Sequence, residues 1–363
     1  MSISSAPLTA PHDIARPGSD PLDRRSEFRS LLTGSSKSRF LTSAWQHFVG
    51  DEYDPDRFAA TVIDFNRSWD WDWVKINPRA VYYSEVWGSV YDPHDYAGVI
   101  PTLVSPAIRS TEDLKRIRPV DPRTNPALSE HLASARLIRE GLPDQPLLQT
   151  VFSPLSVLFQ LAALPLYPHD TVPGAGSTRL THQNLLTDDR ENAHRALSAI
   201  AQTFADYVRL LLAPIDEGGA GLDGIFYAVT GTANASLVSP PDFAEFSRRY
   251  DLEVLEAADG APVILHTCGP DSHPEWFTGY PVDALHWDQF KAGNPTLDAD
   301  LGITVVGGPH HELFAPDADH DRAGAQLDEI LQASPDRPFL LAPSCTVPTP
   351  ADDSLLRLLR DAR

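Results

Sequence analysis

Residues 263–268 read VILHTC, a short apolar run that ends in side chains able to bind metals. Nearly continuous apolar runs of this length, bounded by Gly, Pro or Asp, are typical of strands buried on both faces of a parallel sheet. Seven further runs of this kind occur along the chain: AWQHFVG (44–50), WVKINP (73–78), LLQTVFS (147–153), GIFYAVT (224–230), ALHWD (284–288), ITVVGG (303–308) and FLLAPSC (339–345). The sequence therefore predicts eight buried strands.

Amphipathic helices are predicted between these strands. A capping box at residues 188–191 opens a helical apolar stripe, Ser239 precedes a Pro-Pro helix start, and Asn125–Glu140 carries leucines at helical spacing. Strands alternating with helices predict a single (β/α)8 TIM barrel over residues 23–363. An open, doubly wound sheet is the alternative, which we disfavour because no G-x-G-x-x-G follows a predicted strand.

Three segments fall outside this minimal barrel. Residues 1–22 are rich in Pro, Ser and Ala without apolar periodicity, so we predict a disordered tail. The long stretches at 80–122 and 164–183, which follow the second and third predicted strands, are interpreted as loop insertions that act as lids or docking surfaces.

The composition narrows the classes of function. Acids outnumber bases by 50 to 29 in the 363 residues, a formal charge of −21, which disfavours nucleic acid and anionic membranes as partners. No apolar run approaches the ~20 residues needed to span a bilayer, and the N-terminus lacks the features of a signal peptide. With only two cysteines, a disulfide framework is not expected, so we predict a cytoplasmic protein.

Both cysteines lie at predicted strand ends. His266 and Cys268 are two residues apart on one strand and therefore share a face, and Cys345 ends the last strand. Because strand ends meet at one mouth of a barrel, the three side chains form a candidate zinc site, with Asp288 as the nearest oxygen ligand. Two alternatives stay open: a pair of buried core cysteines, or a purely structural zinc.

The chain also resembles a known superfamily in LHTCGP, in LLAPSCTVPTP and in GIFYAV…ANASLVSPPDFAEF. From about residue 40 onward it is similar to the uroporphyrinogen decarboxylase superfamily, and within it to zinc-dependent methylcobamide:coenzyme M methyltransferases. Their H-x-C…C ligands match His266, Cys268 and Cys345. The resemblance implies methyl transfer from a methylated corrinoid to a zinc-activated thiol. Cobalamin-independent methionine synthases, more distant relatives, add a carboxylate near the position of Asp288.

The same resemblance argues against porphyrin decarboxylation. Uroporphyrinogen decarboxylases carry R-Q-A-G-R after the first strand, whereas residues 45–50 contain no arginine to hold a polycarboxylate. The chain also lacks the D-x-H-x-x-G corrinoid motif, so the corrinoid would arrive on a separate protein or as free cofactor. The alternatives are a metal-independent decarboxylase or lyase acting on a smaller acid, and a non-catalytic partner of a corrinoid protein.

Further candidate residues follow the second strand. A substrate carboxylate or sulfonate could be held by side chains at and just past its end, namely Lys75, Asn77, Arg79, Tyr83 and Glu85. A salt-bridged loop explains the same residues equally well.

Several histidines are also candidates. His47, after the first strand, is a candidate proton carrier or a core histidine, and Asp288 is the second catalytic candidate. His286 shares a strand face with Asp288 and is a candidate to support the metal or bind substrate. The pair His310 and His311 is interpreted as part of a surface loop.

Overall fold

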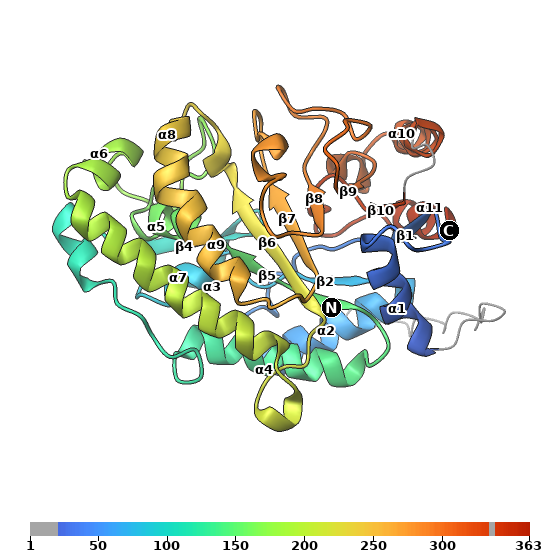
Figure 1. Ribbon diagram of the computed structural model, residues 1–363, viewed down its shortest axis with the longest axis horizontal. Coiled ribbons are helices and arrows are strands. Elements are labelled where there is room, and N and C mark those ends of the chain that lie inside the picture. The colour runs from blue at the N-terminus through green and yellow to red at the C-terminus, as the bar shows by residue number, and fades with distance from the viewer. Residues whose placement is uncertain (1–20, 334–337) are drawn as a thin grey trace, which may run out of the picture.

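Eight parallel strands pair in barrel order in the computed structural model, which describes residues 21–333 and 338–363 (Figure 1). Their order is β1-β10-β9-β8-β7-β6-β5-β2, so consecutive strands of the chain are neighbours, as the TIM-barrel prediction requires. The strands are β1 (Phe40–Thr42), β2 (Val74–Ile76), β5 (Leu147–Phe152), β6 (Gly224–Thr230), β7 (Val263–Thr267), β8 (Ala284–His286), β9 (Thr304–Gly307) and β10 (Phe339–Leu341). The predicted tail lies outside the described residues, except that α1 already begins at Pro21.

Apolar runs located seven of the eight strands. Strand β6 coincides with the predicted run and is buried at every position. The first strand was misplaced: it was predicted at 44–50, but β1 is Phe40–Thr42, paired with β10. Trp45 lies beyond the strand and is buried against the rings of Trp73 and Phe226. Its apolar neighbourhood signalled burial in the core rather than a hydrogen-bonded strand.

The seam between β1 and β2 is joined through Asp72. Its backbone N–H donates to the Thr42 carbonyl (3.0 Å), and its carboxylate accepts from the Thr42 backbone N–H (2.8 Å) and hydroxyl (3.0 Å). No ladder pair joins β1 to β2 within the described ranges. The buried carboxylate therefore supplies contacts that strand pairing makes elsewhere in the barrel.

Helices surround the strands, and the predicted starts are confirmed. Asn125, Asp189 and Ser239 each cap a helix by accepting a backbone N–H. Figure 1 shows α4, α7 and α9 on one side of the strands and α10 and α11 near β10 and β1. The helices are α1 (Pro21–Leu32), α2 (Pro55–Trp69), α3 (Tyr82–Glu85), α4 (Pro126–Gly141), α5 (Pro154–Leu161), α6 (His182–Thr187), α7 (Arg190–Leu212), α8 (Pro240–Phe243), α9 (Arg249–Glu256), α10 (His320–Ala333) and α11 (Asp353–Asp361).

The two predicted insertions pack against each other. The first contains α3 and an antiparallel hairpin of β3 (Val90–Ala97) and β4 (Ile100–Ser105). The Leu103 backbone N–H donates to the Pro173 carbonyl (2.8 Å), and Val172 and Ala175 of the second insertion pack against an apolar cluster that includes Tyr91 and Leu103 of the first. The insertions thus form one unit beside the barrel.

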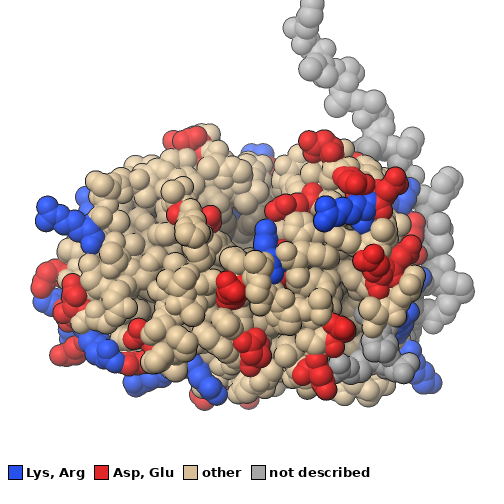
Figure 2. All heavy atoms as spheres, turned by 90° about the horizontal axis from the view of Figure 1, so that it is seen from above, with Lys and Arg blue, Asp and Glu red and all other residues tan. Residues whose placement is uncertain are grey.

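Charge is dispersed on the face shown in Figure 2, where acidic and basic side chains are interspersed among a larger uncharged area. Within residues 21–333 and 338–363, none of the helices combines the length and the apolarity that a membrane crossing requires.

Candidate metal and substrate site

The predicted metal ligands converge after β7 and β10. His266 and Cys268 flank Thr267, whose hydroxyl is turned away and donates to the Ser272 carbonyl (2.6 Å). Cys345 follows β10, and its Sγ lies 4.0 Å from the Sγ of Cys268. The candidate ligand atoms of His266, Cys268 and Cys345 all lie within 4.8 Å of one another. Residues 77 positions apart in sequence therefore share one site.

The donor set fits a zinc ion. Two thiols and an imidazole are the borderline-soft ligands that zinc prefers, and both cysteines are free. The Nδ1 atom of His266 is buried without a hydrogen-bond partner among the described residues. Hydrogen bonds from Cys268 and His266 hold the pKa of the Cys345 thiol well below its ordinary value, so one sulfur of the pair is readily present as thiolate.

These ligands line a cavity of about 190 Å³ at the carboxyl ends of the strands. Lys75 is the only lysine or arginine among the described residues that line it, and no carboxylate lines it. Of the residues predicted to act on substrate, the structure brings five to this cavity: His47, Lys75, Asn77, Tyr83 and His286.

Lys75 is a buried cation beside the candidate metal ligands. Its Nζ donates to the Asn77 Oδ1 (2.5 Å) and lies 4.6 Å from the centre of the Phe226 ring and 5.1 Å from that of Trp45. Burial lowers the pKa of Lys75 from 10.5 to about 7, against an opposing effect of the two cysteines. Lys75 therefore carries a positive charge up to about neutral pH, where it can pair with an anionic group that enters the cavity.

His47 borders the cavity and is oriented by an acid. Its Nδ1 lies 2.9 Å from the Oε1 of Glu52, a side chain with 0% exposure. His286 packs against His266, a candidate metal ligand, with ring centres 4.6 Å apart, and the Nε2 of His286 hydrogen-bonds the Pro343 carbonyl (3.2 Å).

Arg79 and Glu85 do not line the cavity. The Arg79 guanidinium donates to Glu85 (2.8 Å), to Glu130 (2.7 Å) and to the Glu52 carbonyl (2.7 Å), and it stacks on the ring of Tyr53. The two residues thus form the salt-bridged loop that the sequence left open as an alternative. Their ion pairs hold the segment after β2 in place.

Asp288 belongs to a second cluster. Its Oδ2 lies 3.7 Å from the Nε2 of His310 and 3.6 Å from the Nδ1 of His311. The histidine pair, interpreted from sequence as part of a surface loop, is only 18% and 17% exposed. Burial lowers the pKa of His310. The structure groups Asp288 with these imidazoles rather than with the cysteines.

Tyr167 is a site residue that sequence reasoning missed. It lies in the 164–183 insertion, lines the cavity and hydrogen-bonds the Cys268 thiol. A Cβ atom on Gly231 or Gly269 would lie 2.5 Å or 2.9 Å from its ring. The glycine that follows Cys268 in HTCGP was therefore a usable signal, because its missing side chain makes room for an aromatic ring.

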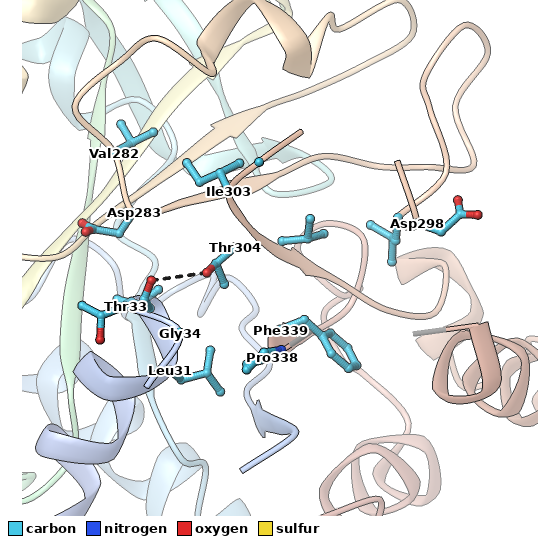
Figure 3. A pocket seen from close by; sticks show the side chains of 14 residues that line it. Leu31, Thr33, Gly34, Val282, Asp283, Asp298, Ile303, Thr304, Pro338 and Phe339 are labelled. Carbon is cyan, nitrogen blue, oxygen red and sulfur yellow. Dashed lines mark hydrogen bonds between the residues drawn. The ribbon is translucent and has the colours of Figure 1, made fainter. Parts of the chain in front are cut away.

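A larger hollow of about 770 Å³ lies at the other end of the strands (Figure 3). It is bordered by the end of α1 and by residues at the starts of β8, β9 and β10. Thr304, labelled in Figure 3, donates to the Leu32 carbonyl (3.4 Å) there. None of the predicted site residues lines this hollow, so we place the chemistry at the smaller cavity.

Residues 45–363 match the family model described as uroporphyrinogen decarboxylase (URO-D). The chain belongs to the uroporphyrinogen decarboxylase family. No curated protein sequence matches the chain. A methyltransferase from Methanosarcina mazei shares the fold, with a TM-score of 0.70, 16% identity and coverage of 93% of this chain and 98% of that one.

Two methionine synthases also share the barrel. A B12-independent enzyme from Shewanella sp. W3-18-1, solved with selenomethionine, aligns with a TM-score of 0.50 and 12% identity over 85% of this chain and 84% of its own. A putative B12-independent methionine synthase from Listeria monocytogenes aligns with a TM-score of 0.51 and 14% identity, over 89% of this chain and 96% of its own. At these identities the likeness establishes the fold.

The lining of the cavity differs from the arginine-rich pattern expected for porphyrin decarboxylation, because no arginine is among the described residues that line it. The segment after β1 places Trp45 and His47 beside the cavity and contains no arginine. A single lysine among the lining residues offers one positive charge, whereas a polycarboxylate porphyrin requires several.

Proposed function

We propose that the protein is a zinc-dependent methyltransferase that moves a methyl group from a methylated corrinoid to a small-molecule thiol. The observation that carries the proposal is the grouping of His266, Cys268 and Cys345 within 4.8 Å at the wall of the cavity. Structural zinc sites are closed by four protein ligands, whereas catalytic sites keep a position for substrate. Three protein ligands facing a cavity favour the catalytic type.

The bound zinc would lower the pKa of a thiol substrate so that it reacts as a thiolate at neutral pH. His266, Cys268 and Cys345 would hold the ion, and the Tyr167 hydroxyl supports the Cys268 sulfur. His47, oriented by Glu52, is placed to accept the proton that the thiol releases. The barrel's other contribution is to position thiol and methyl donor in line.

The remaining groups of the cavity suit an acceptor with one negative charge. Lys75 and Asn77 offer a cation and an amide at one side of the cavity, and Tyr83 borders it. A carboxylate or sulfonate bound there would leave the thiol of the acceptor free to reach the metal held by His266, Cys268 and Cys345. The insertion residues Ile100 and Tyr167 border the cavity, so we propose that a corrinoid protein or the free corrinoid docks over this unit.

Metal analysis of the purified protein tests the proposal. We expect at least one zinc per chain and the loss of one equivalent in Cys345→Ser. Thiol-dependent demethylation of methylcobalamin should occur with the metal-loaded wild type, but not with the metal-free protein or with Cys345→Ser. His273→Gln, which changes a histidine outside the cavity, is the matched control and should keep its zinc and activity. Zinc well below one per chain in the wild type would refute the proposal.

The family supplies the second candidate function, decarboxylation or a lyase reaction on a smaller carboxylic acid without metal. Lys75 alone could hold one substrate carboxylate in the cavity. This candidate requires activity that survives both chelation and Cys345→Ser. A stable complex with a corrinoid protein, with no consumption of methylcobalamin, would instead indicate a non-catalytic partner.

A further inference from the structure

A second cluster of metal-binding side chains lies beside the cysteine site. Asp288 follows β8, and His310 and His311 follow β9, so neighbouring strand ends bring the three residues together. Their candidate ligand atoms lie within 4.8 Å of one another, as in the first group, yet the two groups have no residue in common.

The Asp288 carboxylate is buried, and only one of its two oxygens accepts a hydrogen bond from the described residues. The side chain is 1% exposed, and its Oδ1 accepts the Phe290 backbone N–H (2.9 Å). Its Oδ2 has no hydrogen-bond partner in the described part of the chain and is directed at the two imidazoles. A buried carboxylate oxygen without a donor is costly, so a ligand that supplies positive charge there would be stabilised.

The distances suit a metal ion better than direct hydrogen bonds. Oδ2 lies 3.7 Å from His310 Nε2 and 3.6 Å from His311 Nδ1, beyond hydrogen-bond range. Bonds of about 2.0–2.2 Å to a tetrahedral ion separate its ligand atoms by roughly 3.3–3.6 Å. We propose that Asp288, His310 and His311 bind a second divalent transition-metal ion of the zinc type, separate from the ion at the cysteine site.

The surroundings of His311 are compatible with this role. Its Nε2 lies 3.9 Å from the Oε1 of Glu312, too far for a hydrogen bond, but the negative charge there favours a proton on Nε2 and leaves Nδ1 for the metal. The Ser344 hydroxyl lies 3.1 Å from that Nδ1 and also accepts the His311 backbone N–H (3.1 Å). With a metal on Nδ1, the Ser344 hydroxyl would have to donate its hydrogen elsewhere.

The second site is coupled to the first through the backbone. The Asn294 side-chain amide donates to the Asp288 carbonyl (2.8 Å) and to the carbonyl of Gly269 (3.0 Å), which adjoins Cys268. Ser344 likewise adjoins Cys345. An ion at Asp288 would thus stiffen both cysteine-bearing loops, and the binding site itself does not depend on which reaction the protein catalyses.

Cobalt titration of the metal-free, full-length protein separates the two sites in one experiment. Thiolate ligands give Co²⁺ a strong near-ultraviolet charge-transfer band, whereas nitrogen and oxygen ligands give only weak visible bands. We expect two equivalents to bind, one with the charge-transfer band and one without it. Binding of a single equivalent, or the same thiolate band for both, would overturn the second site.

Variants assign the equivalents to residues. Asp288→Asn keeps the side chain's shape, and His311→Ala removes one ligand; each should lose the equivalent that lacks the thiolate band and retain the other. Cys345→Ser should lose the equivalent with the thiolate band and retain the other. His273→Gln should bind both equivalents of cobalt. If Asp288→Asn loses the thiolate-associated ion, Asp288 is a ligand of the cysteine site and our assignment is wrong. If Cys345→Ser loses a cobalt equivalent but Asp288→Asn and His311→Ala lose none, the second site is refuted and the proposed function remains intact.

Discussion

The substitution Lys75→Met removes the positive charge from the cavity while it keeps a long apolar side chain against the rings of Trp45 and Phe226. Lys75 is the only cation among the described residues lining the cavity, so an anionic acceptor loses its sole charged partner. A hydrogen bond to a charged group contributes about 1.5–3 kcal/mol. At about 1.4 kcal/mol per factor of ten, KM for an anionic thiol should rise about 10-fold to 100-fold.

The pH dependence gives an independent check on the same residue. Because burial lowers the pKa of Lys75 to about 7, the free protein loses the ammonium charge as pH rises through this value. KM for an anionic thiol should be level below pH 7 and rise about tenfold per pH unit above it. In Lys75→Met this rise should disappear, since no group at this position titrates.

Both effects can be measured as thiol-dependent loss of methylcobalamin, with an anionic thiol and an uncharged thiol of similar size compared in parallel. For the uncharged thiol, Lys75→Met should change KM little. Its KM should also show no rise with pH that disappears in Lys75→Met. Equal increases for the two thiols would refute the reasoning, because they would show that Lys75 supports the shape of the cavity rather than the charge of the acceptor.

Three further outcomes are expected. Burial raises the pKa of Asp251 from 3.8 to about 6, so the folded protein retains a proton there that the unfolded chain releases. The free energy of unfolding should therefore fall by on the order of 3 kcal/mol between pH 4 and 6, and comparison of urea titrations with Asp251→Asn should isolate that slope. Arg79→Met leaves two carboxylates without their partner and should destabilise the fold by about 3 kcal/mol in the same assay. Tyr167→Phe removes the hydrogen bond to Cys268 and should weaken zinc binding about 10-fold to 100-fold in competition with a chelator, without changing the unfolding midpoint of the metal-free protein.

Apolar runs and helix-capping residues predicted strands and helix starts correctly where the structure depends on residues close together in sequence. The strand at Gly224–Thr230 is buried on both faces, so its apolar run located it accurately. Asn125, Asp189 and Ser239 cap helices because each side chain accepts a hydrogen bond from a backbone N–H three residues away. The AWQHFVG run failed as a strand because apolar side chains show burial but do not show which backbone groups pair.

The sequence also predicted the grouping of His266, Cys268 and Cys345, which the structure brings together as a candidate metal site. Two-residue spacing places His266 and Cys268 on one face of a strand, and barrel geometry brings Cys345 to the same mouth. Only the tertiary structure decided that Asp288 faces His310 and His311, that Arg79 is held by acids away from the cavity, and that Tyr167 reaches Cys268 from an insertion. Each of these outcomes depends on how a loop returns across the barrel mouth. Loop paths are set by contacts between segments far apart in the chain, which residue spacing does not encode.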